Sequence, residues 1–414
     1  MFKILILTTS LNQQNDSHSM RVKSLIEGLN YSVNDLTIIT TEKALIGFEL
    51  KGVRCISVGT LFFEKLQNFI NKNYVFKQFP ILKSIIFRIF GFISLPDYTF
   101  DYYFKARKVI NDKIDISNVD LIVSTSGGLS THLVGRKIKC KNEKIKFVMD
   151  FGDPWSSNPL PPLSYKHISY LNKILEFNCY KKASLVLVTN DSFKKELQVL
   201  SSKYNFKLGI VPCGFENLIG NVKNKDCLKI NEEVIIGYIG TASSSRDFTS
   251  IISHFKNVVF KFQKKLKFVL AGSISEHILN KVESECDNLK YYGWLSSLEA
   301  AKLQDTCDVL ILPGNNSENQ VPGKVYSYLY SNAIIVYMGH KNLKIDPTWE
   351  VLKNYDGVVR VFFNEVNFEV EKELYTLLFD ERLTLALNSR KEKVERYKWC
   401  NISRQFETEI FEVR

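Results

Sequence analysis

Short runs of β-branched and aliphatic residues alternate along the chain with longer stretches in which apolar residues recur at helical spacing. This alternation is typical of strand–helix units that build a parallel sheet. Two series of such strands are predicted. The first comprises Lys3–Thr9, Leu36–Thr41, Arg54–Val58, Asp120–Ser124, Lys146–Asp150, Ser184–Thr189 and Gly209–Pro212. The second comprises Val234–Ile239, Lys267–Ala271, Val309–Pro313, Ile334–Tyr337 and Val358–Phe362. The pattern therefore predicts an α/β protein with two parallel sheets.

The two series are separated by Gly214–Glu232, which combines glycine, asparagine and mixed charge without an apolar period and is predicted to be a linker. A length of 414 residues suits two domains at roughly 100–200 residues each. We therefore expect a first domain of residues 1–215 and a second domain of residues 216–395. The pattern after about Asp380 is helical with no following strand, so residues 396–414 are expected to form a helix that packs back on the first domain.

Residues 61–95 depart from the alternation. Phe and Ile are interleaved there with the basic residues Lys65, Lys72, Lys77, Lys83 and Arg88. Pro80 and Gly91 are expected to divide this insertion into short helices. Two interpretations stay open, namely helices lying in the headgroup region of an anionic membrane, or an ordinary core-facing helix pair with solvated lysines.

The composition indicates a folded protein, since 45% of the residues are hydrophobic and 24% are charged. The net charge of +11 favours an anionic partner: a phosphate ligand, a nucleic acid or an acidic membrane surface. No nucleic-acid module is visible, so we expect no nucleic-acid partner. Eight cysteines without a CxxC pair or zinc spacing suit a reducing cytoplasm. No signal peptide or spanning helix is predicted, so any membrane contact is expected to be peripheral.

Candidate chemistry in the first domain lies in loops that follow predicted strands, because ligands of open α/β sheets bind beyond the carboxyl ends of the strands. In the first loop Asn15 or Asp16 is the expected helix N-cap, followed by His18 and by Arg21 one turn later. The amide side chains of this loop and His18 are expected to line the binding site, with a plain polar loop as the alternative.

Two further loops of the first domain carry Gly127 and Gly128, which permit close approach of a ligand to the backbone, and His132. Asp153 lies between Gly152 and Pro154 after the next strand. We expect Asp153, His132 and His18 to orient a sugar and its acceptor; a structural cap is the alternative for Asp153.

In the second domain, the turn after Val234–Ile239 contains small residues and Arg246. Free amides, hydroxyl groups and this guanidinium together suit a diphosphate. Pro322 and Gly323 are expected to open a short helix in which Lys324 again favours an anion.

The order of these motifs resembles a known family. DFGDPW is followed by VTNDSFKKEL, IVPCGFE, YIGTASSSRD, FVLAG, YYGWLSSLEAAKLQDTCDVLILP and VPGKVYSYLYSNAII. This series is similar to GT-B glycosyltransferases of the family-4 type, which assemble bacterial surface polysaccharides such as lipopolysaccharide or capsule. The resemblance implies two Rossmann-like domains facing across a cleft, with a C-terminal helix crossing back to the first. It also implies a nucleotide-sugar donor bound by the second domain, an acceptor bound by the first, retention of anomeric configuration, and no metal or other cofactor.

The resemblance also implies site residues in the second domain. Thr241 stands at the first of two basic positions that bind the donor diphosphate in the family, and Arg246 stands at the second. Where the family has two glutamates eight positions apart, this chain has Asn319 and Ser327, with Glu318 one residue away. The expected donor-binding residues are Gly240, Thr241, Ser243, Arg246, Gly272, Gly293, Pro322, Gly323, Lys324 and Ser327.

The sequence thus predicts transfer of a sugar from a nucleotide-sugar to a lipid-linked or growing glycan acceptor. Arg246, with Lys324, would stabilise the charge that grows on the leaving diphosphate. The expected location is the cytoplasm, peripherally on the inner face of the bacterial cytoplasmic membrane, with contact to anionic lipid. The alternatives are a nucleotide-sugar epimerase or hydrolase of the same fold, and a non-catalytic subunit that docks a partner enzyme or the membrane.

Overall fold

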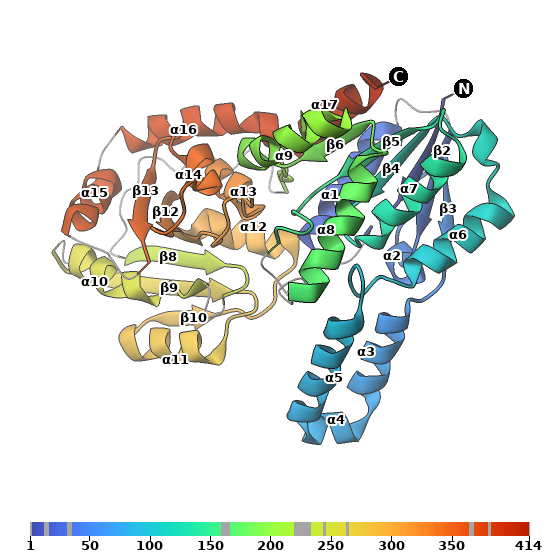
Figure 1. The fold of residues 1–414 in the computed structure, drawn as a ribbon. Helices are drawn as coiled ribbons and strands as arrows, with labels where there is room; N and C mark the ends of the chain where they lie inside the picture. Colours follow the sequence, from blue (N-terminus) through green and yellow to red (C-terminus); the bar gives the residue numbers. More distant parts are fainter. Residues whose placement is uncertain are drawn as a thin grey trace. The chain divides into compact units, whose positions relative to one another are not determined.

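The computed structural model describes residues 2–11, 16–30, 35–158, 166–218, 233–242, 246–261, 265–363, 368–379 and 382–413. It divides the chain into two compact units. Unit 1 contains Met1–Cys213 together with Trp399–Arg414, and unit 2 contains Gly214–Lys398. Each unit is built on one parallel sheet flanked by helices (Figure 1).

The sheet of unit 1 has seven parallel strands in the order β3-β2-β1-β4-β5-β6-β7. The strands are β1 Lys3–Leu7, β2 Asp35–Thr40, β3 Val53–Ser57, β4 Leu121–Thr125, β5 Lys146–Asp150, β6 Leu185–Val188 and β7 Lys207–Ile210. The helices around them are α1 Ser17–Asn30, α2 Glu42–Leu45, α6 Tyr102–Lys113, α7 Ser130–Lys141, α8 Lys166–Tyr180, α9 Asp191–Tyr204 and α17 Trp399–Phe411, with a 3-10 turn at Ile116–Asn118. The strand order runs outward in both directions from the β1–β4 pair, which is the arrangement of a Rossmann-like sheet.

The last helix, α17, packs against α1 within unit 1. The Ser403 hydroxyl donates a hydrogen bond to the Ser24 carbonyl at 3.0 Å. Gly28 makes this approach possible, because a Cβ added there would lie only 2.2 Å from the Cβ of Ser403. A helix at the far end of the chain, α17, thus belongs to the helical layer of unit 1.

The insertion forms a helical hairpin, residues 61–93, between β3 and α6. It consists of α3 Phe62–Lys72, α4 Tyr74–Gln78 and α5 Pro80–Ile93, and its two longer helices extend away from the sheet of unit 1 (Figure 1). Pro80 begins α5, as predicted. The expected break at Gly91 is wrong, because α5 continues to Ile93. Glycine inside a helix costs only about 1 kcal/mol relative to alanine, and stacking of Phe90 on Phe62 and Phe63 holds this last turn.

Unit 2 has a six-stranded parallel sheet in the order β10-β9-β8-β11-β12-β13. The strands are β8 Glu233–Ile239, β9 Lys265–Ala271, β10 Leu289–Tyr291, β11 Val309–Pro313, β12 Ile334–Gly339 and β13 Val358–Phe362. The helices are α10 Ile252–Lys261, α11 Glu276–Glu285, α12 Ser297–Thr306, α13 Lys324–Tyr330, α14 Pro347–Leu352, α15 Phe368–Phe379 and α16 Leu383–Val394, with 3-10 turns at Thr249–Ile251 and Glu395–Tyr397.

The predicted fold class is confirmed, since both units are parallel α/β sheets of the Rossmann-like type. Each predicted strand corresponds to an observed one within about two residues. The three-residue edge strand β10 was not predicted. Most of the predicted linker lies outside the described residues. Among the helices that the structure describes, none combines the length and the hydropathy that crossing a membrane requires.

Arg390 on α16 fastens the helical layer of unit 2 to the sheet. Its side chain is fully buried and donates to the carbonyls of Ser331 at 2.9 Å, Ala333 at 2.8 Å and Asp356 at 3.1 Å. Burial lowers the pKa of this guanidinium to about 9. The group therefore remains a cation at neutral pH and satisfies carbonyls that α13 and the turn before β13 leave unpaired.

We expect Arg390→Met to lower the free energy of unfolding by about 3 kcal/mol, because it leaves several buried carbonyls without a donor. Urea unfolding measures the change. Lys393→Met, at an exposed position of the same helix, is the control and should change stability by less than about 0.5 kcal/mol. Equal stability of the two variants would contradict the role assigned to Arg390.

Candidate functional site

In unit 1, a buried ion pair fixes the edge of the sheet at which the predicted residues lie. Arg21 donates through Nη2 to Asp150 Oδ1 at 2.6 Å and through Nε to Asp150 Oδ2 at 3.2 Å. It also donates to the Pro212 carbonyl at 2.8 Å. Burial alone would lower the pKa of Arg21, but the Asp150 carboxylate outweighs burial and the pKa is raised. This pair holds α1 against the carboxyl end of β5 and the segment after β7.

The N-terminus of α1 is capped by Asp16, whose carboxylate accepts from the Ser19 amide at 2.9 Å, as the sequence predicted. His18 lies in this first turn, and its imidazole fills the space left by two glycines. A Cβ added to Gly127 would lie 2.6 Å from His18 Cδ2, and one added to Gly152 would lie 2.9 Å from His18 Nδ1. His18 is thereby held against the loops that follow β4 and β5.

The electrostatics of His18 favour a neutral ring. Burial lowers its pKa, and the charges of Asp16, Asp150 and Asp153 oppose that effect only in part. Its Nε2 is buried and has no hydrogen-bond partner among the residues that the structure describes. A neutral imidazole with one buried and unsatisfied ring nitrogen thus lies at the carboxyl edge of a parallel sheet, the edge at which such sheets bind ligands.

The glycines of the β4 loop act differently from the sequence expectation. Gly127 makes room for His18, and a Cβ on Gly128 would meet the hydroxyl oxygens of Thr9 and Thr99 at 2.6 and 2.7 Å. The space beside both glycines is therefore filled by side chains of the protein. The expectation of close ligand approach is corrected to close packing of the chain on itself.

His132 lies in the interior and exposes no surface that a ligand could touch. Its Nδ1 is 2.6 Å from the Ser124 hydroxyl oxygen, and its ring centroid lies 4.7 Å from Phe151 and 5.6 Å from Trp155. Burial lowers its pKa to about 3, with a smaller contribution from His18. The ring is thus neutral at working pH, and its geometry supports a positioning role beneath the site instead of the expected contact with sugar or acceptor.

Asp153 is exposed at the end of β5, in the turn after Gly152. Its charge contributes to raising the pKa values of both His18 and Cys213, so the carboxylate lies near these two side chains. Asp97 was not predicted; its Oδ2 accepts from the Leu129 amide at 2.9 Å and so fixes the start of α7. The local sequence feature that marks this residue is the Asp-Tyr-Thr turn, in which the amide and the hydroxyl of Thr99 donate to Asp97 Oδ1.

In unit 2, the structure brings together Lys324 and the end of β8. The Lys324 ammonium lies 4.4 Å from the Tyr238 ring centroid, 3.3 Å from the Tyr238 hydroxyl and 3.4 Å from the Ile239 carbonyl. A Cβ on Gly240 would come within 2.4 Å of this ammonium. Glycine at that position therefore leaves room for the lysine.

Arg246 is the second cation of this cluster. Its Nη2 donates to the Asn315 side-chain oxygen at 2.6 Å, which joins the loop after β8 to the loop after β11. Burial, and then the positive charge of Arg246, lower the pKa of Lys324 to about 7. Neither cation forms a salt bridge with a carboxylate of the described residues. Asn315 was not predicted, because an amide in a run of polar loop residues carries no distinctive signal.

Backbone hydrogen bonds donated by two glycines align the loops that surround this cation cluster. The Gly240 amide donates to the Ala271 carbonyl at 2.8 Å, and the Gly272 amide donates to the Gly293 carbonyl at 2.7 Å. Gly272 has φ +106°, and a Cβ there would lie 2.2 Å from the Gly240 carbonyl oxygen. Three of the predicted glycines thus form one continuous, closely packed edge at the ends of β8, β9 and β10.

The remaining predicted donor residues are less directly engaged. The Ser327 hydroxyl donates to the Lys324 carbonyl at 3.0 Å, within its own helix. Thr241 is exposed, and its carbonyl accepts the Tyr238 hydroxyl. Pro322 is buried and Gly323 precedes α13. Glu318 Oε1 accepts from the Lys344 amide at 3.0 Å, and Ser243 lies outside the described residues.

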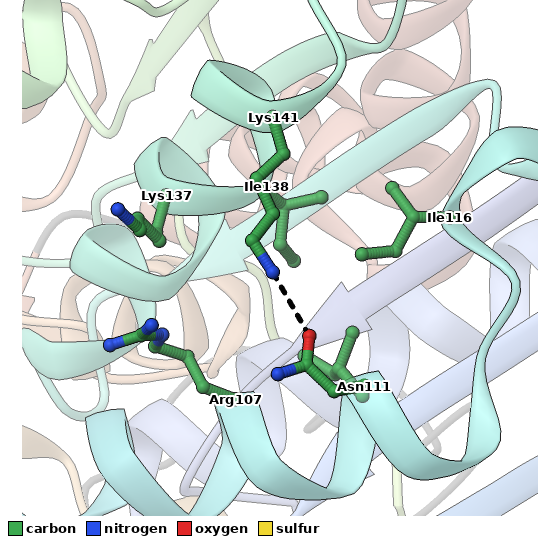
Figure 2. Close-up of a pocket in the computed structure, with 7 residues that line it drawn as sticks. Arg107, Asn111, Ile116, Lys137, Ile138 and Lys141 are labelled. Carbon is green, nitrogen blue, oxygen red and sulfur yellow. Dashed lines mark hydrogen bonds between the residues drawn. The ribbon is translucent and has the colours of Figure 1, made fainter.

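A hollow elsewhere in unit 1 lies between α6 and α7 (Figure 2). It is lined by Arg107, Ile110, Asn111, Ile116, Lys137, Ile138 and Lys141. The Lys141 ammonium donates to Asn111 Oδ1 at 3.0 Å, as the dashed line in Figure 2 shows. These residues lie where α6 and α7 lead into the amino ends of β4 and β5. Because parallel sheets bind ligands at the opposite edge, we do not assign the candidate site to this hollow.

Comparison with known proteins bears on the fold. No protein family model and no curated protein sequence matches the chain. Sucrose-phosphate synthase from Thermosynechococcus elongatus is similar in structure, with a TM-score of 0.68, 13% identity, and coverage of 100% of this chain and 99% of that one. Anabaena HepE in complex with UDP and glucose gives a TM-score of 0.61 at 12% identity, covering 99% and 100% of the two chains. WaaG, a glycosyltransferase involved in lipopolysaccharide biosynthesis, gives 0.61 at 9% identity, covering 97% and 98%.

These structures are GT-B glycosyltransferases, and the chain shares their fold over its whole length. The GT-B fold that the resemblance implied is therefore confirmed. The low identities extend the likeness to the fold and no further, so the chemistry must be argued from the side chains of this chain.

The lowered pKa of Lys324 predicts a pH-dependent stability. Between pH 7 and 10 the folded state holds Lys324 neutral while the unfolded chain holds it protonated, so folding releases a proton and stability from this group rises with pH. Relative to Lys324→Met, the wild type should be least stable below about pH 7, and the difference in melting temperature should shrink as the pH rises from 7 toward 10. Differential scanning calorimetry measures it. Lys393→Met should show a pH-independent difference; the same flat profile for Lys324→Met would contradict the buried-lysine assignment.

Proposed function

We propose that this protein is a glycosyltransferase that moves a sugar from a nucleoside-diphosphate sugar to a lipid-linked or growing glycan acceptor with retention of configuration. The observation that carries the proposal is the pair of cations in unit 2, Lys324 and Arg246, which are held at the ends of β8 and β11 without a carboxylate partner among the described residues. A buried cation without a counterion is costly unless a ligand supplies the anion.

The donor diphosphate is the anion that fits this cluster. Two adjacent cations of different geometry suit a diphosphate, because Arg246 can form paired hydrogen bonds and Lys324 acts as a point charge. Thr241 is exposed directly after Gly240 at the end of β8, so a phosphate can reach this edge. The neighbour HepE was solved in complex with UDP and glucose, which supports a nucleotide as a ligand of this fold.

In this mechanism, negative charge grows on the leaving diphosphate as its bond to the sugar breaks. Lys324 and Arg246 stabilise that charge, and they do so more strongly in a partly desolvated site than in water. The diphosphate raises the affinity of Lys324 for its proton, so donor binding takes up a proton at neutral pH. The proposal requires no metal, because the two cations provide the charge.

For unit 1 we propose binding of the acceptor. The exposed Asp153 carboxylate and the partly exposed His18 ring lie at the same sheet edge, and we assign to them the orientation of acceptor and sugar hydroxyls; Nε2 of His18 is buried and has no hydrogen-bond partner among the described residues. His132 supports this edge from below through Ser124 and the aromatic side chains around it. The proposed role is surface polysaccharide synthesis at the cytoplasmic face of a bacterial membrane, as the WaaG-like fold supports.

We predict that Arg246→Ala weakens binding of the correct donor about 10–100-fold and lowers turnover with it, since a charge-assisted contact to phosphate contributes roughly 1.5–3 kcal/mol. A thermal-shift screen of UDP, GDP, CMP and dTDP sugars first identifies the donor, because a ligand that binds only the folded state raises its melting temperature. Calorimetry with that donor then measures the loss.

Arg404→Ala removes an exposed arginine of α17 and serves as the control with unchanged donor binding. Equal donor affinity in Arg246→Ala and the wild type would exclude the assigned site. Absence of nucleotide binding by calorimetry, together with stable association with a partner, would favour a non-catalytic subunit. If the donor alone is converted without an acceptor, an epimerase or hydrolase is indicated.

A second prediction concerns the acceptor side. His18→Phe keeps an aromatic ring between the glycines but removes the ring nitrogens, so turnover should fall about tenfold or more while donor affinity stays unchanged. Single-turnover kinetics with saturating donor measure the change. His277→Phe, at an exposed position of unit 2, should leave turnover unaltered. Loss of donor affinity in His18→Phe would contradict the division of roles between the units.

A further inference from the structure

The helical hairpin of unit 1 exposes an unusual amount of apolar surface. On α5, Ile81, Ile85 and Ile89 are spaced by four residues and form one stripe, with exposed fractions of 76%, 46% and 59%. At the turn of the hairpin, Tyr74 is 69% exposed and Phe79 is 58% exposed. Phe62, Phe69 and Leu82 are also exposed among the hairpin side chains whose exposure the structure describes. Monomeric soluble proteins rarely leave such a patch uncovered without a binding role.

The hairpin has its own apolar interior, so the exposed stripe is not the result of poor packing. Phe63 stacks on Tyr98 with a centroid distance of 4.2 Å and on Phe90 at 5.2 Å, and it lies 5.8 Å from Phe87. The Phe62 amide donates to Asp101 at 2.9 Å, which ties α3 to the start of α6. The inner faces of α3 and α5 are therefore filled by aromatic side chains. The isoleucine stripe lies on the outer face of α5, where it is not needed for the packing of the hairpin.

The charges around the stripe select the kind of partner. Lys65, Lys72 and Arg88 are exposed, and Lys83 lies 5.8 Å from the Phe87 ring centroid with its ammonium bonded to Asn71. The segment contains one acidic residue, Glu64, which accepts from the Leu61 amide at 2.9 Å in a helix cap. The surface thus combines exposed isoleucine and aromatic side chains with a clear excess of positive charge.

This combination fits an anionic lipid surface better than a protein surface. Lysine is depleted in protein interfaces, and a second copy of the same hairpin would bring like charges together. Apolar side chains on a basic helix bind the boundary between headgroups and acyl chains of an anionic membrane. The α5 helix has 14 residues, or about 21 Å, which is shorter than the roughly 30 Å of a bilayer core. It can lie in the interface but cannot cross the bilayer.

We propose that the helical hairpin docks the protein on an anionic phospholipid bilayer, with the isoleucine stripe and the turn residues Tyr74 and Phe79 in the interface and the basic residues on the headgroups. The inference deepens the proposed function by naming the partner of this surface. It rests on that function only for the reason why a membrane would be useful, namely access to a lipid-linked acceptor.

Vesicle flotation with the full chain tests the proposal. Vesicles of phosphatidylcholine with 30% phosphatidylglycerol, a composition chosen at roughly the anionic content that attracts basic segments, should carry the protein upward. Vesicles of phosphatidylcholine alone should carry far less, and salt at about 0.5 M should release much of the bound protein, because it screens the headgroup charges.

Two variants separate the apolar and the charged contributions. Ile81→Gln/Ile85→Gln/Ile89→Gln should lower the vesicle partition coefficient at least tenfold. Lys65→Gln/Lys72→Gln/Arg88→Gln should lower it by roughly a factor of five per charge on anionic vesicles. All six positions are exposed or on the hairpin surface, so the melting temperature should change by only a few degrees.

Matched controls come from outside the hairpin. Val199→Gln/Ile345→Gln/Leu385→Gln removes three aliphatic residues with exposed fractions of 76%, 44% and 72%. Lys195→Gln/Lys372→Gln/Lys393→Gln removes three exposed lysines. Both control variants should float like the wild type.

Three outcomes would overturn the proposal: no flotation of the wild type, equal flotation of the hairpin and control variants, or a stable dimer in solution that the isoleucine variant dissociates. Donor binding by calorimetry is measured in parallel on the same proteins. If donor binding is normal but flotation is lost, the docking surface is wrong and the proposed function stands. If flotation is normal but no donor binds, the proposed function is wrong and the docking surface stands.

Discussion

In both units of this protein, the strand order of the parallel sheet reverses in the middle of the sheet. At that point the loops that follow two neighbouring strands lead away in opposite directions, which leaves a space between them. In unit 1 the reversal falls between β1 and β4, and in unit 2 it falls between β8 and β11. Because all strands are parallel, the loops that leave their carboxyl ends meet at the same edge. His18 and Asp153 lie at this edge of unit 1, and Lys324 and Arg246 lie at this edge of unit 2.

The two edges use similar cations for different purposes. Arg21 makes two contacts to the Asp150 carboxylate and one to a backbone carbonyl. Its charge is balanced within the protein, so it holds α1 in place and is not needed for a ligand. Among the described residues Lys324 has only neutral partners, including the Tyr238 ring and the Ile239 carbonyl, and its charge is opposed by burial and by the nearby Arg246. A buried group can be costly to the folded state and useful to a bound anion for the same reason. Arg21, which has a carboxylate partner, is therefore assigned to the scaffold, and Lys324, which has none among the described residues, to the candidate site.

The sequence predicted most of the fold because hydrophobic runs of strand length mark buried parallel strands directly. It also predicted the Asp16 cap and the cations of unit 2, since these residues lie next to clear strand ends. It could not predict that His132 faces the core, because the side of a helix that a residue occupies depends on how α7 packs against Phe151 and Trp155. The pairing of Arg21 with Asp150 spans 129 positions, and Asn315 contacts Arg246 across 69. Such long-range contacts have no local signature, and neither does the continuation of α5 through Gly91.

The packing of α17 against α1 makes unit 1 discontinuous along the chain, since its last helix begins only at Trp399. During synthesis on a ribosome, the sheet of unit 1 can assemble early, yet the groove at Gly28 and Ser24 stays uncovered until nearly all of unit 2 has been translated. The nascent first unit therefore leaves the face of α1 that α17 covers exposed for the time that about 185 residues need, at 5–20 residues per second roughly 10–40 seconds. Chaperone protection during this interval, and sensitivity of the N-terminal half to changes at the far end of the reading frame, follow from one helix arriving late.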